Sequence, residues 1–274
     1  MIAAISPERA ALRAWLAAFR LARRYHRYEV RGLDALLAPG SKLVVGYHGR
    51  PAAIDLCMLT TVIHERLGYL PHGVIHAAFT AHPFAKRLVD GLGFVTGDGP
   101  AIEAAVRRGE HVLVQPGGTR EGYRSFRHRY EVDWGDRTGY LRLAIEHRLP
   151  IVPVAASGVD DVFVGLVDGH ALGKRAGMPH RLPLWLGVGM TGVWPFSLPF
   201  PVKITQLVGS PITAHLDLDR GRPDRTALLA VHRRVAGEVQ SLLDQARGRP
   251  RTPDLQFAVS PNFQPISTTE VLQP

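Results

Sequence analysis

The chain has 274 residues, of which 46% are hydrophobic, enough for one α/β domain with a sizeable core. Its formal net charge is +9, and a surplus that large indicates an anionic partner: a nucleic acid, an anionic membrane surface or a polyphosphate-bearing substrate. The single cysteine, Cys57, excludes an internal disulfide framework and any zinc site built from several cysteines.

The first residues, 1–15, lack the unbroken apolar core of a secretory signal, so we expect a cytoplasmic setting. Residues 7–25 predict a helix with Pro7 in its first turn. An apolar stripe and a basic stripe share this helix: Leu12, Trp15, Leu16 and Phe19, and Arg9, Arg13, Arg20 and Arg24. The helix either packs on the core with a solvated basic face or lies at an anionic membrane surface, and both can hold. We assign residues 1–27 to this amphipathic segment.

Strand and helix patterns alternate through the middle of the chain. Apolar runs typical of buried strands cover residues 43–47, 73–78, 111–115 and 150–156. Helical patterns lie between them, from near Pro51 to residue 67 and at 82–92, 101–110 and 139–148. This alternation predicts an α/β fold with a largely parallel central sheet flanked by helices. Ligands of such sheets bind beyond the carboxyl ends of the strands.

The C-terminal third of the chain follows the pattern less regularly. Residues 203–212 predict one more strand, and residues 224–247 predict a long helix with apolar residues at helical spacing. We therefore expect a single domain over residues 28–247. The proline-rich tail, residues 248–274, is expected to be disordered or to wrap the surface.

An uncharged apolar run extends from Leu182 to Val202. Its 21 residues are enough to span a membrane, but four prolines and three glycines argue against a spanning helix. Two interpretations stay open: buried packing, or an apolar loop that dips into a membrane interface. Trp185 and Trp194 suit an interface because indole has an apolar body and a polar edge.

The stretch GYHGRPAAID, residues 46–55, raises the question of whether His48 and Asp55 form a catalytic pair or are a turn histidine and a solvated helix residue. Residues seven apart on one helix are separated by about 10.5 Å along its axis, too far for a shared hydrogen bond. We therefore expect His48 in the loop after a strand, with Gly49 giving a sharp turn. Asp55 is then expected in the first turns of the next helix, reaching back to His48.

A second candidate segment is PGGTREG, residues 116–122, which also follows a predicted strand. The backbone N–H groups of Gly117 and Gly118 can approach a ligand closely because no Cβ intervenes. Arg120 offers a charged fork for an anion or a developing oxyanion, and Glu121 is expected to hold Arg120 or to bind a hydroxyl. Which of these donors faces the oxyanion stays open.

Three segments together resemble a known family. YHGRPAAIDLCML (47–59), QPGGTREG (115–122) and RTGYLRLAIEHRLPIVPVAASG (137–158) are similar to motifs of the glycerolipid acyltransferase superfamily, the lysophosphatidic acid acyltransferase group. The resemblance extends over roughly residues 30–215. His48 and Asp55 are separated by six residues, more than in the commonest form of the motif. Gly117 stands where that form has glutamate, which resembles the mono- and diacylglycerol acyltransferase-like branch, whose acceptors are neutral.

The resemblance implies an O-acyltransferase that moves a fatty acyl group from acyl-CoA to a hydroxyl of a glycerolipid or related lipid alcohol. It implies His48 as the general base, oriented by Asp55, with no covalent acyl-enzyme. The residues implied in substrate binding are Gly49, Gly117, Gly118, Thr119, Arg120 and Glu121. Cys57 is expected to pack in the core.

The expected partners are acyl-CoA as co-substrate, a lipid acceptor and an anionic membrane surface on the cytoplasmic side, with peripheral attachment. No metal or other cofactor is expected. No nucleic acid is expected as a partner either, since no nucleic-acid recognition motif accompanies the positive charge. One alternative is a lysophospholipid (1-acylglycerol-3-phosphate) acyltransferase. A non-catalytic lipid- or membrane-binding protein is the alternative from another class.

Overall fold

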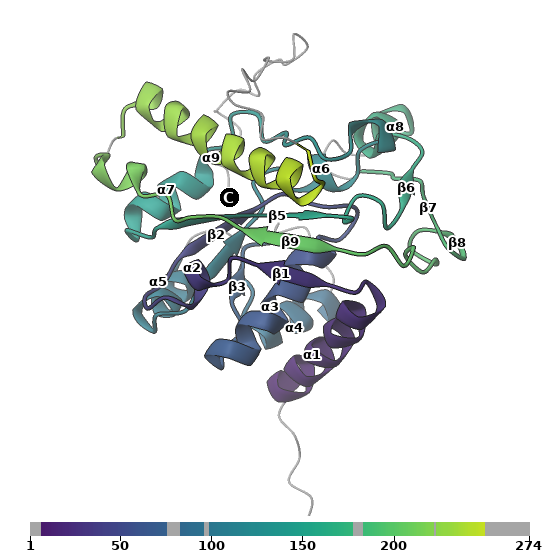
Figure 1. Cartoon of the computed structure of the whole chain (residues 1–274), viewed down its shortest axis with the longest axis horizontal. Helices are drawn as coiled ribbons and strands as arrows, with labels where there is room; N and C mark the ends of the chain where they lie inside the picture. The colour runs from purple at the N-terminus through teal and green to yellow at the C-terminus, as the bar shows by residue number, and fades with distance from the viewer. Residues whose placement is uncertain (1–6, 76–82, 96–98, 178–182, 222, 250–274) are drawn as a thin grey trace, which may run out of the picture.

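A six-stranded sheet forms the centre of the molecule (Figure 1). The computed structural model describes residues 7–75, 83–95, 99–177, 183–221 and 223–249. The strands of the sheet are β1 (Glu29–Arg31), β2 (Leu43–Gly46), β3 (His72–Gly73), β4 (Val112–Val114), β5 (Ile151–Ser157) and β9 (Thr205–Val208), in the order β1-β9-β5-β2-β4-β3. β3, β4, β2 and β5 are mutually parallel, while β9 is antiparallel to β5 and parallel to β1. The predicted largely parallel sheet is confirmed.

Helices cover both faces of this sheet (Figure 1). One face carries α1 (Pro7–Tyr25), α2 (Asp34–Leu37), α3 (Ile54–Leu67), α4 (Pro83–Leu92) and α5 (Pro100–Arg107). The other carries α7 (Gly139–Glu146) and α9 (Arg225–Ala246). The remaining elements are α6 (Thr119–Gly122), α8 (Gly169–Arg175), 3-10 turns at Phe126–His128 and Ala214–Asp217, and a small sheet of β6 (Val164–Gly165), β7 (Gly187–Gly189) and β8 (Gly192–Val193).

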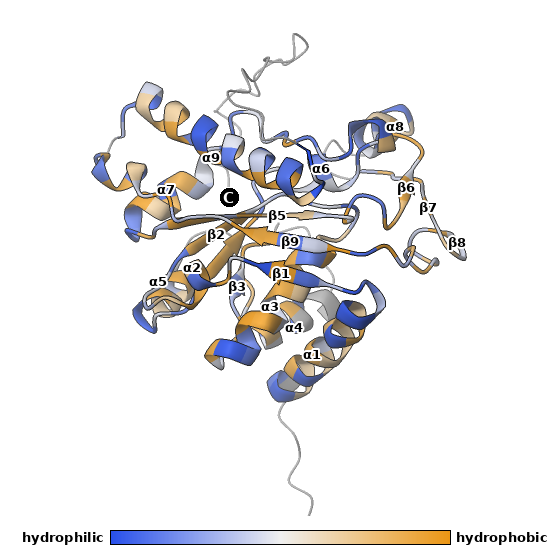
Figure 2. Cartoon of the chain, viewed as in Figure 1, coloured by the Kyte–Doolittle hydropathy of each residue, from blue (hydrophilic) through white to orange (hydrophobic). Residues whose placement is uncertain are grey.

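The core lies between the sheet and these helix layers. Every residue of β2 is buried, as are all but the last of β5. Strands in the middle of such a sheet contact a helix layer on each side, so they are apolar along their whole length rather than alternating. Figure 2 shows hydrophobic colour on β2, with hydrophilic residues on the outer helix faces.

Helix α1 packs on the domain through its apolar stripe. Trp15 donates from Nε1 to Thr60 Oγ1 on α3 at 2.9 Å, and its ring contacts that of Phe94. Arg20 and Arg23 form ion pairs with the Glu65 carboxylate. The packed alternative therefore holds for the apolar stripe, while Arg9, Arg13 and Arg24 stay exposed.

Some predicted element boundaries are wrong. The helix expected to start near Pro51 starts at Ile54, because residues 50–53 form a turn whose Arg50 side chain is buried. The strand expected over 73–78 is His72–Gly73 with a bridge at Val74, and residues 76–78 lie outside the described part of the chain. Residues 250–274 of the predicted tail also lie outside it.

The uncharged segment 182–202 has both buried and exposed side chains. Trp185 is 7% exposed and packs edge-on against Phe163, whereas Phe196 is 93% exposed. Each of the two sequence interpretations therefore fits only part of the segment, and Leu182 lies outside the described residues. Among the helices of the described ranges, none has the length and apolar character needed to cross a membrane.

Candidate active site

Three neighbouring parallel strands end at one edge of the sheet and carry the residues of the candidate site. His48 follows β2, the segment 116–122 follows β4, and Asp160 follows β5. β2 lies between β4 and β5 and is parallel to both. The carboxyl ends of parallel strands meet at a common edge, so the two predicted loops converge as expected and a third joins them.

His48 lies in the loop between β2 and α3, as predicted, and not in a helix. Its Nδ1 is 3.0 Å from the carbonyl oxygen of Gly49. Because a carbonyl oxygen only accepts, Nδ1 carries the proton and Nε2 holds the basic lone pair. Burial lowers the pKa of His48 below its ordinary value, and the bond to Gly49 offsets part of that effect. The imidazole is therefore neutral at pH 7.

Two glycines make room for this histidine. A Cβ on Gly122, the last residue of α6, would lie 2.7 Å from Cε1 of His48 and 2.8 Å from Nδ1. A Cβ on Gly49 would lie 2.1 Å from Cγ2 of Val159, in the loop after β5. Gly49 is thus required by close packing of the two loops. The His48 imidazole packs directly against the backbone of Gly122.

Asp55 does not pair with His48 in this structure, contrary to expectation. It is the second residue of α3 and is buried, and neither of its carboxylate oxygens has a hydrogen-bond partner among the described residues. Burial raises the pKa of Asp55 to about 7. The Gly49 carbonyl, and not Asp55, fixes the His48 tautomer in this structure. The loop before α3, which starts at Ile54, turns the imidazole toward the backbone of the next residue.

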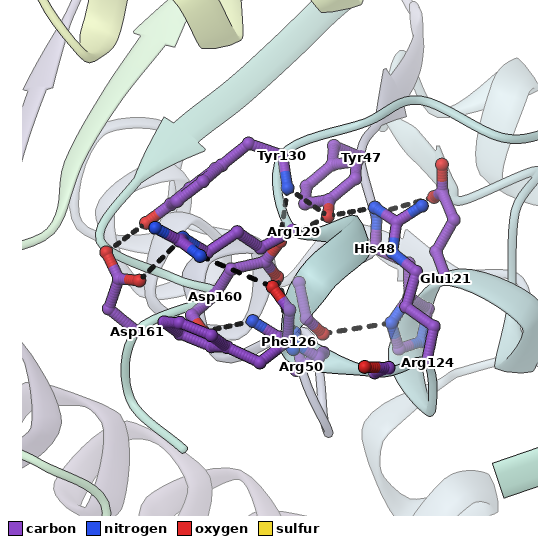
Figure 3. Close-up of polar contacts among 12 residues, drawn as sticks. Tyr47, His48, Arg50, Glu121, Arg124, Phe126, Arg129, Tyr130, Asp160 and Asp161 are labelled. Atoms are coloured by element: carbon purple, nitrogen blue, oxygen red, sulfur yellow. Dashed lines mark hydrogen bonds and ion pairs between the residues drawn. The ribbon is translucent and has the colours of Figure 1, made fainter. Parts of the chain in front are cut away.

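Glu121 holds the loop of His48 in place (Figure 3). Its Oε2 accepts the backbone N–H of His48 at 2.9 Å, and its Oε1 accepts the backbone N–H of Asp133 at 2.8 Å. The side chain is fully buried, and this burial raises the pKa of Glu121 to about 7, opposed by the nearby Arg124 guanidinium and the two backbone bonds. Of the two roles expected of Glu121, holding Arg120 is not seen, since Arg120 pairs with Asp133, and binding a hydroxyl stays a prediction.

Gly117 provides the space that the Glu121 carboxylate occupies. A Cβ on Gly117 would lie 2.1 Å from both Cδ and Oε2 of Glu121. A glutamate at position 117, as in the commonest form of the motif, is therefore incompatible with this placement of Glu121.

Arg120 is held by Asp133 at 2.7 Å, and both side chains remain partly exposed. Gly118, with φ of 51°, precedes α6, and its backbone N–H donates to the Gln115 carbonyl at 3.1 Å. Of the oxyanion donors considered from the sequence, the Gly118 N–H is thus already engaged. Thr119 opens α6 and is partly buried.

A buried polar network lies next to the His48 loop (Figure 3). The Tyr47 hydroxyl and the Tyr130 backbone N–H donate to Asp160 Oδ2 at 2.5 and 2.6 Å. Arg124 donates to the Tyr47 hydroxyl. Arg50 is fully buried, donates to the Asp160 carbonyl at 2.5 Å and places Nε 3.5 Å from Oδ1. These contacts join the loops after β2 and β5 to residues after α6.

Sequence reasoning missed Tyr47, Arg50, Arg124, Asp133 and Asp160. Tyr47 and Arg50 lie on either side of His48 in the quoted motif. An arginine so close to the end of an apolar strand was the signal that could have indicated a buried ion pair. Asp133 and Asp160 lie in loops with no pattern of their own, so their roles depend on which strands are neighbours.

Cys57 is partly buried, and burial together with the Asp55 charge raises its pKa to about 12, which makes a thiolate nucleophile unavailable at neutral pH.

Comparison with curated proteins finds relatives among lipid-synthesising enzymes. The chain is 27% identical over 232 residues to a Gallus gallus protein named "DGAT1/2-independent enzyme synthesizing storage lipids", covering 82% of this chain and 66% of that protein. The Homo sapiens protein of the same name is 27% identical over 225 residues, with 80% and 66% covered. An uncharacterized Mycobacterium tuberculosis protein is 25% identical over 207 residues, with 69% and 52% covered. The matches span just under two thirds of the vertebrate relatives' length.

No protein-family model matches the chain. Among solved structures, the 1-acyl-sn-glycerophosphate (LPA) acyltransferase PlsC from Thermotoga maritima is similar, with a TM-score of 0.48, 15% identity and 84% of this chain and 80% of that chain covered. The printed name of the vertebrate relatives describes enzymes of lipid synthesis, which agrees with the resemblance seen in the motifs.

Proposed function

We propose that this protein is an O-acyltransferase that moves a fatty acyl group from acyl-CoA to the hydroxyl of a glycerolipid or related lipid alcohol. The names of the vertebrate relatives support lipid synthesis as the setting. The donor, the acceptor and the residue roles are parts of the proposal.

The environment of His48 carries the proposal. Its Nδ1 proton is engaged by Gly49, its pKa is lowered by burial, and its backbone is fixed by Glu121 of the second motif. A neutral imidazole with a free Nε2 lone pair is the group that general-base attack by a hydroxyl requires. Such base catalysis contributes about 10²- to 10⁴-fold to the rate.

In the proposed step, Nε2 of His48 takes the proton from the acceptor hydroxyl as its oxygen bonds to the thioester carbonyl carbon. The tetrahedral oxyanion then collapses, the carbon–sulfur bond breaks and the CoA thiolate takes the proton from the imidazolium. The products are the ester and CoA thiol. The Asp160 carboxylate, whose charge raises the pKa of His48, stabilises the imidazolium without a direct bond to it.

The partly exposed Arg120 guanidinium suits an anionic donor. Arg120 is partly exposed, and its ion pair uses Nε, so its terminal nitrogens can reach the oxyanion or a CoA phosphate. A net charge of +9 favours both CoA and an anionic membrane, to which we propose peripheral attachment on the cytoplasmic side.

A neutral acceptor is proposed over a lysophospholipid. The supporting observation is that Gly117 stands where the commonest motif has glutamate, which resembles the branch with neutral acceptors. A side-by-side assay with monoacylglycerol, diacylglycerol, a long-chain alcohol and lysophosphatidate separates these alternatives.

The central experiment compares His48→Ala with His128→Ala, whose side chain is 63% exposed at a 3-10 turn. Acyl transfer from radiolabelled acyl-CoA should be lost in His48→Ala and retained in His128→Ala, with circular dichroism of both like that of the wild type. Near-normal transfer by His48→Ala would exclude the mechanism. A wild-type protein that binds lipid but transfers no acyl group to any acceptor would favour the non-catalytic alternative.

A further inference from the structure

In the described part of the chain, the large exposed apolar side chains are concentrated in one segment. The described residues include eight large hydrophobic side chains that are well exposed, and seven of them lie between Leu166 and Leu198. Single exposed hydrophobic residues are ordinary, but such clustering marks an interaction surface. We define the apolar tip as the members of this cluster in the uncharged segment: Leu184, Leu186, Met190, Val193, Phe196 and Leu198.

The apolar tip is part of a hydrogen-bonded structure. It is built on β6, β7 and β8, which lie with α8 at one end of the molecule (Figure 1). Met190 N–H donates to the Leu198 carbonyl at 2.8 Å, and Leu198 N–H donates to Thr191 Oγ1 at 3.0 Å. The Phe163 ring contacts both Trp185 and Trp194. This framework keeps Phe196 outside, 93% exposed, while the tryptophans pack inward.

The charges around the apolar tip are positive. On one side, the end of α1 joins it, since Tyr25 donates to the Pro199 carbonyl at 2.7 Å and Arg27 to the Pro201 carbonyl at 2.9 Å. On the other side lies α8, whose last turn exposes Lys174 and Arg175. The start of α8 is joined to the tip by the Leu184 N–H, which donates to the Gly169 carbonyl at 2.9 Å.

Acidic side chains in the segments beside the apolar tip have partners of their own. Glu29 pairs with Lys203 at 2.7 Å, and Asp168 accepts the Ala171 N–H at 2.8 Å as the cap of α8. An uncharged apolar protrusion flanked by arginine and lysine matches an anionic lipid surface, because apolar side chains enter the interface while basic residues contact the headgroups.

The segments that adjoin the apolar tip are hydrogen-bonded to residues beside the candidate active site. Trp185 donates from Nε1 to the Arg124 carbonyl at 3.1 Å, and Gly169 donates its N–H to the Tyr123 carbonyl at 2.7 Å. Tyr123 and Arg124 follow Gly122, on which the His48 imidazole rests. A surface bound at the apolar tip is therefore connected to the loop of His48 through a short, buried path.

We propose that the apolar tip docks this protein onto an anionic lipid surface. Lipid binding at the tip stands independently of the reaction, whereas its use in presenting a lipid acceptor to His48 rests on the proposed function. The occupant is the membrane interface itself, and a protein partner or a second copy of the chain is an outcome that the experiment detects.

The test is co-sedimentation of the full chain with two kinds of vesicle: phosphatidylcholine alone, and phosphatidylcholine mixed with phosphatidylglycerol. The wild type should bind the mixed vesicles more tightly, and a Phe196→Ser, Leu198→Ser double variant should bind them about tenfold more weakly or worse. Lys174→Gln with Arg175→Gln should weaken binding only to the mixed vesicles. Arg233→Gln with Arg234→Gln, on exposed positions of α9, is the matched charge control and should bind like the wild type.

Undiminished binding by the Phe196, Leu198 double variant, or no binding of the wild type to either vesicle, overturns the proposal. A wild-type dimer that this variant converts to a monomer, without lipid binding, assigns the tip to a second copy and also overturns it. The variant must keep the circular dichroism and thermal transition of the wild type. His48→Ala should bind vesicles normally, so tip-dependent binding without any acyl transfer would sustain the docking surface while the proposed function fails.

Discussion

The carboxylate of Glu121 accepts the backbone N–H of His48 at 2.9 Å, and this bond joins the loop after β4 to the loop after β2. Its second oxygen accepts the backbone N–H of Asp133 at 2.8 Å. One buried side chain thus ties together the two segments that carry the candidate chemistry. The Glu121 carboxylate thus positions the His48 imidazole through the backbone, and none of the hydrogen bonds among the described residues joins the two side chains.

Glu121→Gln should lower kcat while changing the KM for acyl-CoA little. The amide has one accepting oxygen, so one of the two backbone N–H groups loses its partner and the His48 loop shifts. A displacement near 1 Å can cost about 10²-fold in rate, and we expect a loss of about 10- to 100-fold in steady-state kinetics. Glu131→Gln, with a side chain 61% exposed, is the control and should leave both constants unchanged. Wild-type kcat in Glu121→Gln would refute the positioning role.

Gly122→Ala should inactivate the enzyme without unfolding it. The new Cβ would lie 2.7 Å from Cε1 of His48, so the imidazole must move. We expect kcat to fall by about 100-fold. Gly237→Ala in α9 is the matched control: no atom lies within 4 Å of its new Cβ, so activity should persist and stability should rise by up to about 1 kcal/mol. Equal activities in the two variants would show that His48 does not need this contact.

The pH–rate profile should show an acid limb below pH 6.5. The base must be neutral to accept a proton, and burial lowers the pKa of His48 from its ordinary value of 6.5. The value of kcat/KM should therefore stay level as the pH falls to 6.5 and drop only below that. An acid limb centred above 6.5 would mean that a group other than a buried, neutral histidine controls the rate.

Asp55→Asn should stabilise the folded protein more at pH 8 than at pH 4. Burial raises the pKa of Asp55 from 3.8 to about 7, so the folded state holds its proton more tightly than the unfolded chain does. The stability of the wild type therefore declines as the pH rises between these two values, and asparagine removes that decline. Thermal unfolding across the pH range measures the difference. A gain that is constant with pH would contradict the assignment.

Asp160→Ala should destabilise the fold strongly. The substitution leaves the fully buried Arg50 without its counter-charge and removes the acceptor of the Tyr47 hydroxyl. Breaking one partner of a buried pair costs about 3–5 kcal/mol, measured by urea unfolding. Asp161→Ala is the neighbouring control, since that side chain is 39% exposed and bonds the Tyr130 hydroxyl, and its cost should be clearly smaller. Equal costs would mean that the buried pair adds no specific stability.

Local patterns predicted the elements that depend on local physics. The helix expected over 7–25 is α1, and the helix expected over 224–247 differs from α9 by one residue at each end. Both have an apolar stripe at helical spacing, a property of neighbouring residues alone. The start of α3 was predicted three residues too early, because burial of Arg50 against Asp160, a contact between distant loops, holds residues 50–53 in a turn.

The sequence by itself determined that the candidate site would lie at two strand ends, since alternating strands and helices form a parallel sheet whose carboxyl ends share one edge. It also determined that His48 would leave the helix. Only the tertiary structure decided the pairing: Glu121 supports His48, Asp133 holds Arg120, and Asp55 has no hydrogen-bond partner in the described ranges. Such bonds depend on which strands are neighbours and on where each loop turns, and spacing along the chain records neither.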